Sequence, residues 1–265
     1  MKLLKTVRNL VFYLGLYLIA QVLVISLFGI INFNKIQNAD EFNALINSYV
    51  YLLTGISAIF TLIIYAIVLK IRKRKLIKIC KFNKIGIKEV ICTTLISLGI
   101  AVLSCSLVSV LKDKFAYNVG ENLSNSSNIF LTLFITIIIL PTFEEILFRG
   151  LIFNELRSKY NVTLAVIIQG IIFGTMHGNV IQGIYTVILG VILSMIYIWT
   201  DSIYSCIIGH IVYNFLGTLV VPNILINKKI MYLSIIVAIV IIGVCCNIIY
   251  KNKKKLALEG VRDGI

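Results

Sequence analysis

Charged residues are scarce in this 265-residue sequence, where Asp, Glu, Lys and Arg together make up 14% of the chain. A soluble domain carries about 25% of these residues and about 45–50% apolar residues. Here 59% of the residues are hydrophobic and the mean hydropathy is +0.99. This scarcity of charge argues against an ordinary soluble domain and indicates a protein that crosses a membrane several times.

Several hydrolase motifs are missing as well. The sequence contains no G-x-S-x-G elbow, no H-E-x-x-H zinc motif and no Ser-His-Asp pattern. No two of the six cysteines form a C-x-x-C pair, which argues against a zinc finger or a redox motif. Most cysteines lie inside apolar runs, so we interpret them as small hydrophobic side chains.

Acidic residues are far fewer than basic ones, 11 against 25, which gives a formal net charge of +14. Such an excess can indicate nucleic-acid binding. In this sequence, however, the basic residues cluster at the ends of apolar runs, as the positive-inside rule requires of membrane proteins. Residues 70–88 carry nine Lys and Arg and no acidic residue, and should form a cytoplasmic loop. We therefore expect a lipid bilayer as partner and no nucleic acid.

Eight apolar runs predict an all-α, polytopic transmembrane bundle of about eight spans. The runs cover residues 10–31, 48–69, 90–111, 129–156, 162–177, 180–199, 203–221 and 230–250. An even number of spans puts both termini on one side, where 19 of the 25 Lys and Arg residues then fall. This asymmetry predicts an N-in, C-in topology. The fifth and sixth runs are separated by almost no loop, so one of them can be re-entrant.

Three regions are expected along the chain. Residues 1–125 hold three spans and the basic loop, residues 126–222 hold four spans and a candidate catalytic core, and residues 223–265 hold the last span and a basic tail. The composition is rich in Ile, Lys and Asn, which suggests an AT-rich bacterial genome. We therefore expect a multi-pass protein of a bacterial plasma membrane.

The fourth run contains two carboxylates and an arginine, Glu144, Glu145 and Arg149, at a depth where hydrocarbon is expected. A charge there costs about 2.5–3.5 kcal/mol on insertion scales, so it is rarely present without a use. Glu145 and Arg149 are four residues apart and can pair on one helix face. Glu144 points about 100° away and has no local partner. One carboxylate is thus expected to be neutralised and the other to be available for chemistry.

Both histidines of the chain also lie in apolar runs. His177 follows Phe173 by four residues, and His210 precedes Asn214 by four, so each pair shares a helix face. We expect these groups to form one site with the two glutamates. Glu144 can act as general base on a water molecule, and His210 and Asn214 can donate hydrogen bonds to an oxyanion. Glu144, His177 and His210 could instead ligate Zn²⁺.

Three short motifs together resemble those of the CPBP family of intramembrane proteases. The motifs are Glu144-Glu145-x-x-x-Arg149, Phe173-x-x-x-His177 and His210-x-x-x-Asn214, in this order. The family comprises the type II CAAX prenyl endopeptidases and bacterial relatives tied to bacteriocin processing and self-immunity, the Abi proteins. Each motif is weak by itself, whereas the three in order within membrane spans are specific.

The resemblance implies an eight-span helical core whose site opens toward the cytoplasm, and the hydrolysis of a peptide bond. Glu144 would activate water, His177 would assist, and His210 and Asn214 would stabilise the oxyanion. Supporting roles would fall to Glu145, Arg149 and Phe173. The family is commonly called a metalloprotease family, but the resemblance does not decide whether a metal takes part, and we favour metal-independent catalysis.

The substrate implied is a peptide precursor or a membrane protein, since a prenylated substrate does not suit a bacterium. Two other functions are compatible with a membrane protein of this composition. The chain could be a non-enzymatic immunity or binding protein that keeps the motifs as a scaffold, or a proton-coupled transporter that uses Glu144 and His177 as relay groups. An unpaired Glu144 favours the protease over a scaffold, and the lack of internal repeats argues against the transporter.

Overall fold

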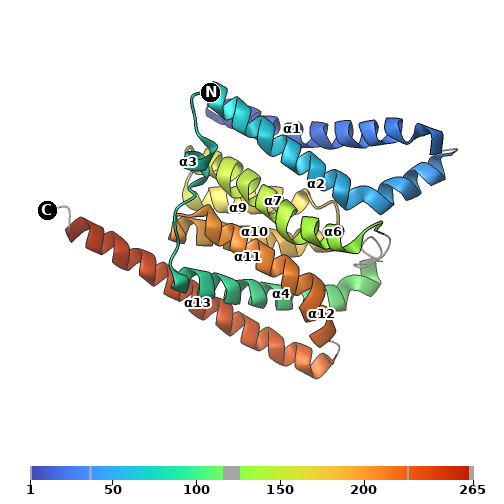
Figure 1. Ribbon diagram of the computed structural model, residues 1–265. Helices are drawn as coiled ribbons and strands as arrows, with labels where there is room; N and C mark the ends of the chain where they lie inside the picture. The colour runs from blue at the N-terminus through green and yellow to red at the C-terminus, as the bar shows by residue number, and fades with distance from the viewer. Residues whose placement is uncertain (1, 36–37, 116–125, 226, 263–265) are drawn as a thin grey trace.

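The structure of the chain is a computed structural model that describes residues 2–35, 38–115, 126–225 and 227–262. Within these ranges the chain forms helices and no strands, as Figure 1 shows. The elements outside the motif-bearing segment are α1 (Lys2–Ile31), η1 (Phe33–Lys35), α2 (Ala39–Ile71), α3 (Leu76–Cys80), α4 (Ile87–Phe115), α9 (Val162–Thr175), α10 (Val180–Thr200), α11 (Ile203–Phe215), η4 (Leu216–Val220), α12 (Val221–Ile224) and α13 (Lys228–Arg262). The predicted all-α, polytopic architecture is confirmed.

A single helix of 29 residues, Ile129–Arg157, carries the Glu-Glu-Arg motif. Its parts are α6 (Ile129–Phe134), the π-helical segment η2 (Ile135–Ile139), α7 (Leu140–Glu145), the π-helical segment η3 (Ile146–Phe153) and α8 (Asn154–Arg157). Pro141 accounts for η2, because proline lacks a backbone N–H and its ring collides with the carbonyl four residues back. The wider π turn removes this collision, so the helix continues past the proline.

Within the described ranges, seven helices are long and apolar enough to cross a membrane, so the chain is a multi-pass membrane protein. α9 has only 14 residues, or about 21 Å at 1.5 Å per residue, against a hydrocarbon core of about 30 Å. It ends at Thr175, and Gly178, with a φ of +68°, lies in the turn into α10. The fifth predicted span is thus a short helix. The count of eight spans and the N-in, C-in topology stay predictions.

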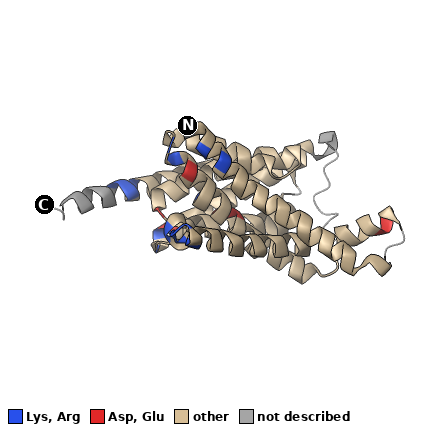
Figure 2. Cartoon of the chain, turned by 90° about the horizontal axis from the view of Figure 1, so that it is seen from above, with Lys and Arg blue, Asp and Glu red and all other residues tan. Residues whose placement is uncertain are grey.

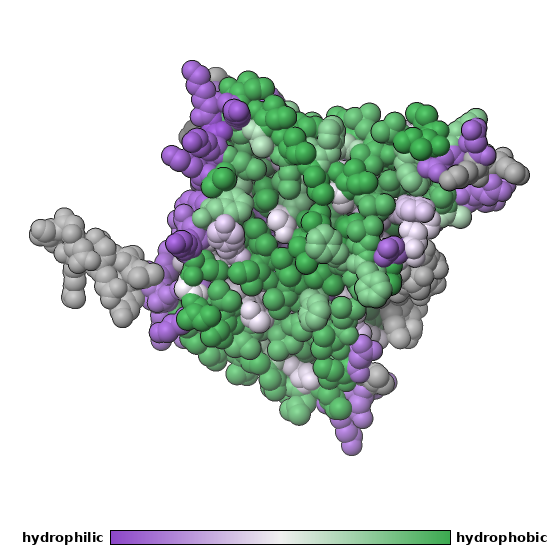
Figure 3. All heavy atoms as spheres, viewed as in Figure 1, coloured by the Kyte–Doolittle hydropathy of each residue, from purple (hydrophilic) through white to green (hydrophobic). Residues whose placement is uncertain are grey.

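The surface supports the membrane assignment. A broad hydrophobic band covers the face drawn in Figure 3, and hydrophilic residues gather at its edges. Figure 2 shows most of the coloured Lys and Arg segments at the end of the bundle that also holds the two chain termini. The predicted division at residue 125 falls at the edge of residues 116–125, which lie outside the described part of the chain.

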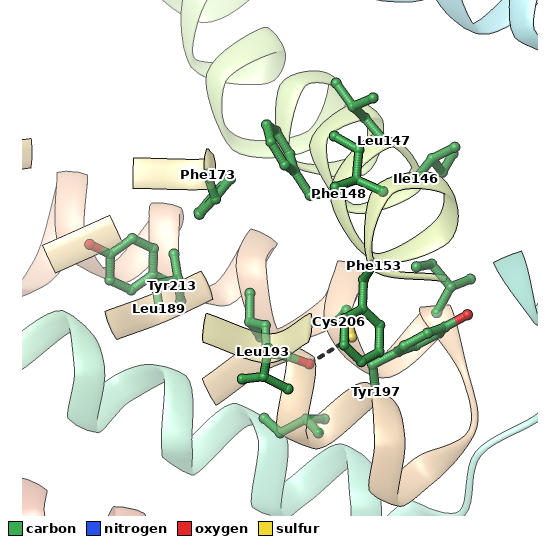
Figure 4. Packing of buried hydrophobic residues seen from close by; sticks show 14 of the residues in the cluster. Ile146, Leu147, Phe148, Phe153, Phe173, Leu189, Leu193, Tyr197, Cys206 and Tyr213 are labelled. Atoms are coloured by element: carbon green, nitrogen blue, oxygen red, sulfur yellow. Dashed lines mark hydrogen bonds between the residues drawn. The ribbon is translucent and has the colours of Figure 1, made fainter. Parts of the chain in front are cut away.

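The bundle packs around the motif-bearing helix. α4 contacts both α11 and α13, α9 packs against α10, and α1 pairs with α2 (Figure 1). Every residue of η3 is buried. Phe148 and Phe173 meet edge to face with ring centres 4.8 Å apart, and Phe153 meets Tyr197 at 6.0 Å (Figure 4). Aromatic side chains therefore pack against the buried η3 segment of the motif-bearing helix.

The basic loop 70–88 is partly folded against this core. Cys80 at the end of α3 is completely buried, and its Sγ lies against Gly150, where a side chain would collide with it. Burial raises the pKa of the Cys80 thiol to about 12, so the thiol is protonated and packs as an apolar group. Asn154 donates to Ile79 O at 2.8 Å, and Tyr197 donates to Cys80 O at 3.1 Å. The loop thus anchors the end of the motif-bearing helix.

Candidate active site

Glu145 and Arg149 form a completely buried ion pair in the centre of the bundle. Arg149 Nη1 lies 2.6 Å from Glu145 Oε1, and both side chains have 0% exposed surface. Arg149 also donates through Nη2 to Gly190 O at 3.3 Å, and its guanidinium carbon lies 4.6 Å from the centre of the Phe173 ring. The carboxylate, the carbonyl and the aromatic face together compensate the buried positive charge.

His210 of α11 lies next to both glutamates, with which it was expected to form one site, although the sequence did not predict which atoms meet. Its Nδ1 lies 2.7 Å from Glu145 Oε1, and its Nε2 lies 3.7 Å from Glu144 Oε2. Since a carboxylate only accepts hydrogen bonds, Nδ1 is the donor and Nε2 is the atom that faces Glu144. Glu145 therefore fixes the orientation of His210 in addition to pairing with Arg149.

His177 lies just beyond the end of α9, in the turn that leads to α10. Its Nδ1 is 2.9 Å from Phe173 O. A carbonyl accepts, so this nitrogen donates and Nε2 is left as the acceptor. The Phe173 ring centre lies 4.9 Å from that of His177 and 5.8 Å from that of His210. Phe173 thus packs between both imidazoles and the guanidinium of Arg149.

Glu144 and His177 line one pocket, with a volume of about 220 Å³. The other lining residues are Tyr17, Leu18, Gln21, Thr54, Phe143, Phe148 and Met176. The Glu144 side chain is 24% exposed, whereas that of Glu145 is 0% exposed. A small molecule in the pocket can therefore reach Glu144 but not Glu145. This agrees with the helix-face argument that leaves Glu144 without a local partner.

Sequence reasoning missed the residues that α1 and α2 contribute to this pocket. A signal was present, because Asn9, Tyr13, Tyr17 and Gln21 recur every four residues in an otherwise apolar run. Such spacing places them on one face of α1. They were not singled out because tyrosine in a membrane span is common.

Asn214 lies on α11, and its side chain contacts the motif-bearing helix. It is not among the residues that line the pocket. Its Nδ2 donates to the backbone carbonyl of Thr136 at 2.9 Å. In a regular helix the Thr136 carbonyl would accept from the N–H of Leu140, or from that of residue 141 in a π turn. Here the Leu140 N–H bonds Ile135 O, and Pro141 has no N–H. Asn214 therefore satisfies a carbonyl that the proline leaves open. One of its two amide hydrogens remains for another acceptor.

The part of the chain that carries the three motifs is similar in sequence to known proteins. Residues 126–216, which contain all three motifs, match the sequence model of a family described as type II CAAX prenyl endopeptidase Rce1-like. Residues 126–216 are thus similar to this family. The resemblance inferred from the motifs is thereby confirmed, and α1, α2 and α4 lie before the matched residues.

A curated relative is similar over part of its length. The chain is 27% identical over 107 residues to the "Putative membrane peptidase YdiL" of Bacillus subtilis (strain 168). The similarity covers 38% of this chain and 44% of that protein, so less than half of the relative is represented. No solved structure matches the chain.

A double-variant experiment tests the role of Asn214 in the bundle. Asn214→Leu leaves Thr136 O unpaired, and we expect it to lower stability by about 1–3 kcal/mol. In the Pro141→Ala background the loss should be smaller, because the alanine N–H can bond that carbonyl. Thermal unfolding in detergent measures both losses. Equal losses in the two backgrounds would show that Asn214 does not compensate for the proline.

The residues named above as Zn²⁺ ligands lie near one another but are not grouped as a metal site. Among the described residues, no three His, Cys, Asp or Glu side chains are grouped so that they could hold a metal ion. Each histidine has Nδ1 engaged and Nε2 open, which is the donor chemistry that zinc sites use. Glu144, His177 and His210 nevertheless form no such group. No step below uses a metal.

Proposed function

We propose that the protein is an intramembrane endopeptidase that hydrolyses a peptide bond of a membrane-associated peptide or membrane protein. One observation carries the proposal: of two adjacent glutamates at membrane depth, Glu145 is buried and paired, while Glu144 is 24% exposed in a pocket beside His177. A charge at this depth is costly, so an accessible carboxylate that no arginine or lysine neutralises is explained by its chemistry. The Rce1-like match supports a peptidase.

In the proposed reaction, Glu144 acts as general base. His177 Nε2 accepts a hydrogen bond from one O–H of a water molecule, and Glu144 removes the proton of the other O–H, which directs the water lone pair at the peptide carbonyl carbon. The new C–O bond forms as the carbonyl electrons move onto oxygen. When the tetrahedral intermediate collapses, the C–N bond breaks and Glu144 returns its proton to the leaving amine.

His210 and Asn214 are proposed to stabilise the oxyanion. With Nδ1 held by Glu145, the Nε2 atom of His210 faces the site and donates when it carries a proton. The positive charge of that form is balanced by the neighbouring carboxylate. Asn214 contributes through its second amide hydrogen while the first remains on Thr136 O.

A product search tests the function directly. The protein and its Glu144→Ala variant are reconstituted in liposomes and incubated with a library of precursor and C-terminal peptides, and products are read by mass spectrometry. We expect peptides that the parent generates and the variant does not. If neither protein generates a product, a binding or immunity role becomes the better hypothesis, and protection of cells from a peptide toxin is the next measurement.

Metal removal gives a separate prediction. We expect hydrolysis in liposomes to continue unchanged after treatment with EDTA or phenanthroline, because the proposed base acts on water without a metal. The chelators must be tested on both sides of the bilayer so that access does not limit them. Loss of activity that added Zn²⁺ restores would contradict metal-independent catalysis and assign Glu144 or the histidines as ligands.

A further inference from the structure

The first helix forms one wall of the pocket that contains Glu144. Tyr17, Leu18 and Gln21 line it from α1, opposite Phe143 and Glu144 of α7. In Figure 1, α1 runs beside α2 at the edge of the bundle. α1 precedes residues 126–216, the part of the chain that matches the family model.

Contacts along one face of α1 hold this wall in place. Asn9 donates to Glu155 Oε1 at 3.0 Å, which joins α1 to α8 at the end of the motif-bearing helix. One turn later, Tyr13 O accepts from the Tyr65 hydroxyl of α2 at 2.5 Å. One turn later again, the Tyr17 ring lies 4.6 Å from the Phe143 ring. Contacts on three successive turns of α1 therefore hold Tyr17 in its position.

The polar groups on this wall are arranged to present a donor. Gln21 lies one turn after Tyr17 on the same face of α1, and both residues line the pocket together with Glu144. The third polar group, Thr54, already donates its hydroxyl hydrogen to Val50 O at 2.7 Å. Since the Gln21 amide can donate to the Tyr17 oxygen, the Tyr17 hydrogen is available to an acceptor in the pocket.

We propose that Tyr17, oriented by Gln21, binds the substrate peptide by donating a hydrogen bond to a backbone carbonyl next to the scissile bond. This inference rests on the proposed hydrolysis at Glu144. The apolar lining of Leu18, Phe148 and Met176 then receives one substrate side chain. At about 220 Å³, the pocket is smaller than the ~300–1,000 Å³ sites of drug-sized ligands. The substrate class is a peptide with one unmodified, medium-sized aliphatic residue at the cleaved bond.

Kinetics in liposomes on a peptide from the product search test the proposal. Tyr17→Phe keeps the ring contact with Phe143 and removes only the hydroxyl. We expect KM to rise about fivefold to tenfold with little change in kcat, as for a bond made equally in ground and transition states. Tyr13→Phe, one turn away and outside the pocket lining, is the matched control and should leave KM unchanged.

Two further variants separate positioning from simple structural damage. Gln21→Leu should raise KM less than Tyr17→Phe, and the double variant should equal Tyr17→Phe alone, because Gln21 acts through Tyr17. Met176→Ala should move the preferred substrate residue from leucine toward phenylalanine. The proposal is overturned if Tyr17→Phe behaves like Tyr13→Phe, or if the two α1 effects simply add.

A binding measurement keeps this proposal distinct from the hydrolysis itself. Photoreactive peptides with benzoylphenylalanine beside the central aliphatic residue are irradiated with the Glu144→Gln variant in liposomes, and the cross-linked residues are mapped by mass spectrometry. Cross-links on α1 around Leu18 support the proposal that α1 binds the substrate, even if the parent protein cleaves no peptide. Cross-links that avoid α1 contradict it even if hydrolysis is observed.

Discussion

Glu144→Gln is expected to lower kcat by about 10²–10⁴-fold, the usual contribution of general acid–base catalysis. An amide cannot take the proton from water, yet it has nearly the size and shape of the carboxylate. The side chain is partly exposed, and it lies 3.7 Å from His210 Nε2 without an arginine or lysine partner among the described residues. Its loss should therefore leave packing intact, and the unfolding temperature in detergent should stay within a few degrees of the parent value.

The control for this prediction is the same chemical change at an exposed glutamate. Glu41 lies in the first turn of α2, outside the pocket lining, so Glu41→Gln should retain full activity. Activity is measured in liposomes as product formed per folded protein. If Glu144→Gln keeps more than a tenth of the parent kcat, the base is another group. A large fall in unfolding temperature would instead assign Glu144 a structural role.

Breaking the buried ion pair is expected to have the largest effect on stability. Removal of one partner leaves an uncompensated charge in the core, a loss of about 3–5 kcal/mol. Glu145→Gln leaves Arg149 without its counter-charge and weakens the support of His210 Nδ1. Arg149→Met leaves Glu145 charged in an apolar site. Both single variants should therefore unfold at clearly lower temperature and yield less folded protein.

The double variant distinguishes the ion pair from general packing. Glu145→Gln with Arg149→Met removes both charges, so its loss should be well below the sum of the two single losses. As a surface control, Asp201→Asn removes one partner of the exposed Lys81–Asp201 pair, for which about 0–1 kcal/mol is expected. Thermal unfolding and size-exclusion recovery in one detergent measure all four variants. Additive losses, or single variants as stable as the parent, would show that the pair does not stabilise the fold.

The variants also separate stability from catalysis. Glu144→Gln should affect turnover with normal folding, whereas Glu145→Gln should reduce the amount of folded protein and, through His210, the activity of what remains. This difference between neighbouring glutamates follows from their positions on the helix. One faces the pocket, and the other faces the core with 0% exposed surface.

The sequence by itself determined the features that depend on neighbours within one helix. Long apolar runs predicted the helices that can cross a membrane, because the bilayer rewards apolar surface whatever the tertiary contacts are. The spacing of Glu145 and Arg149 predicted their pair, since residues four apart share a face. The same spacing predicted that Glu144 has no local partner and that Phe173 and His177 lie together.

The tertiary structure decided which helix faces meet. His210 is 65 residues from Glu145 along the chain, and Asn214 is 78 residues from Thr136, so no local spacing encodes either contact. The expected role of Asn214 did not include the carbonyl left open by Pro141, because that need arises only once the π turn forms. Tyr17 reaches Glu144 because α1 packs on the motif-bearing helix. Such contacts depend on how whole side-chain surfaces fit together, which a pattern within one segment does not contain.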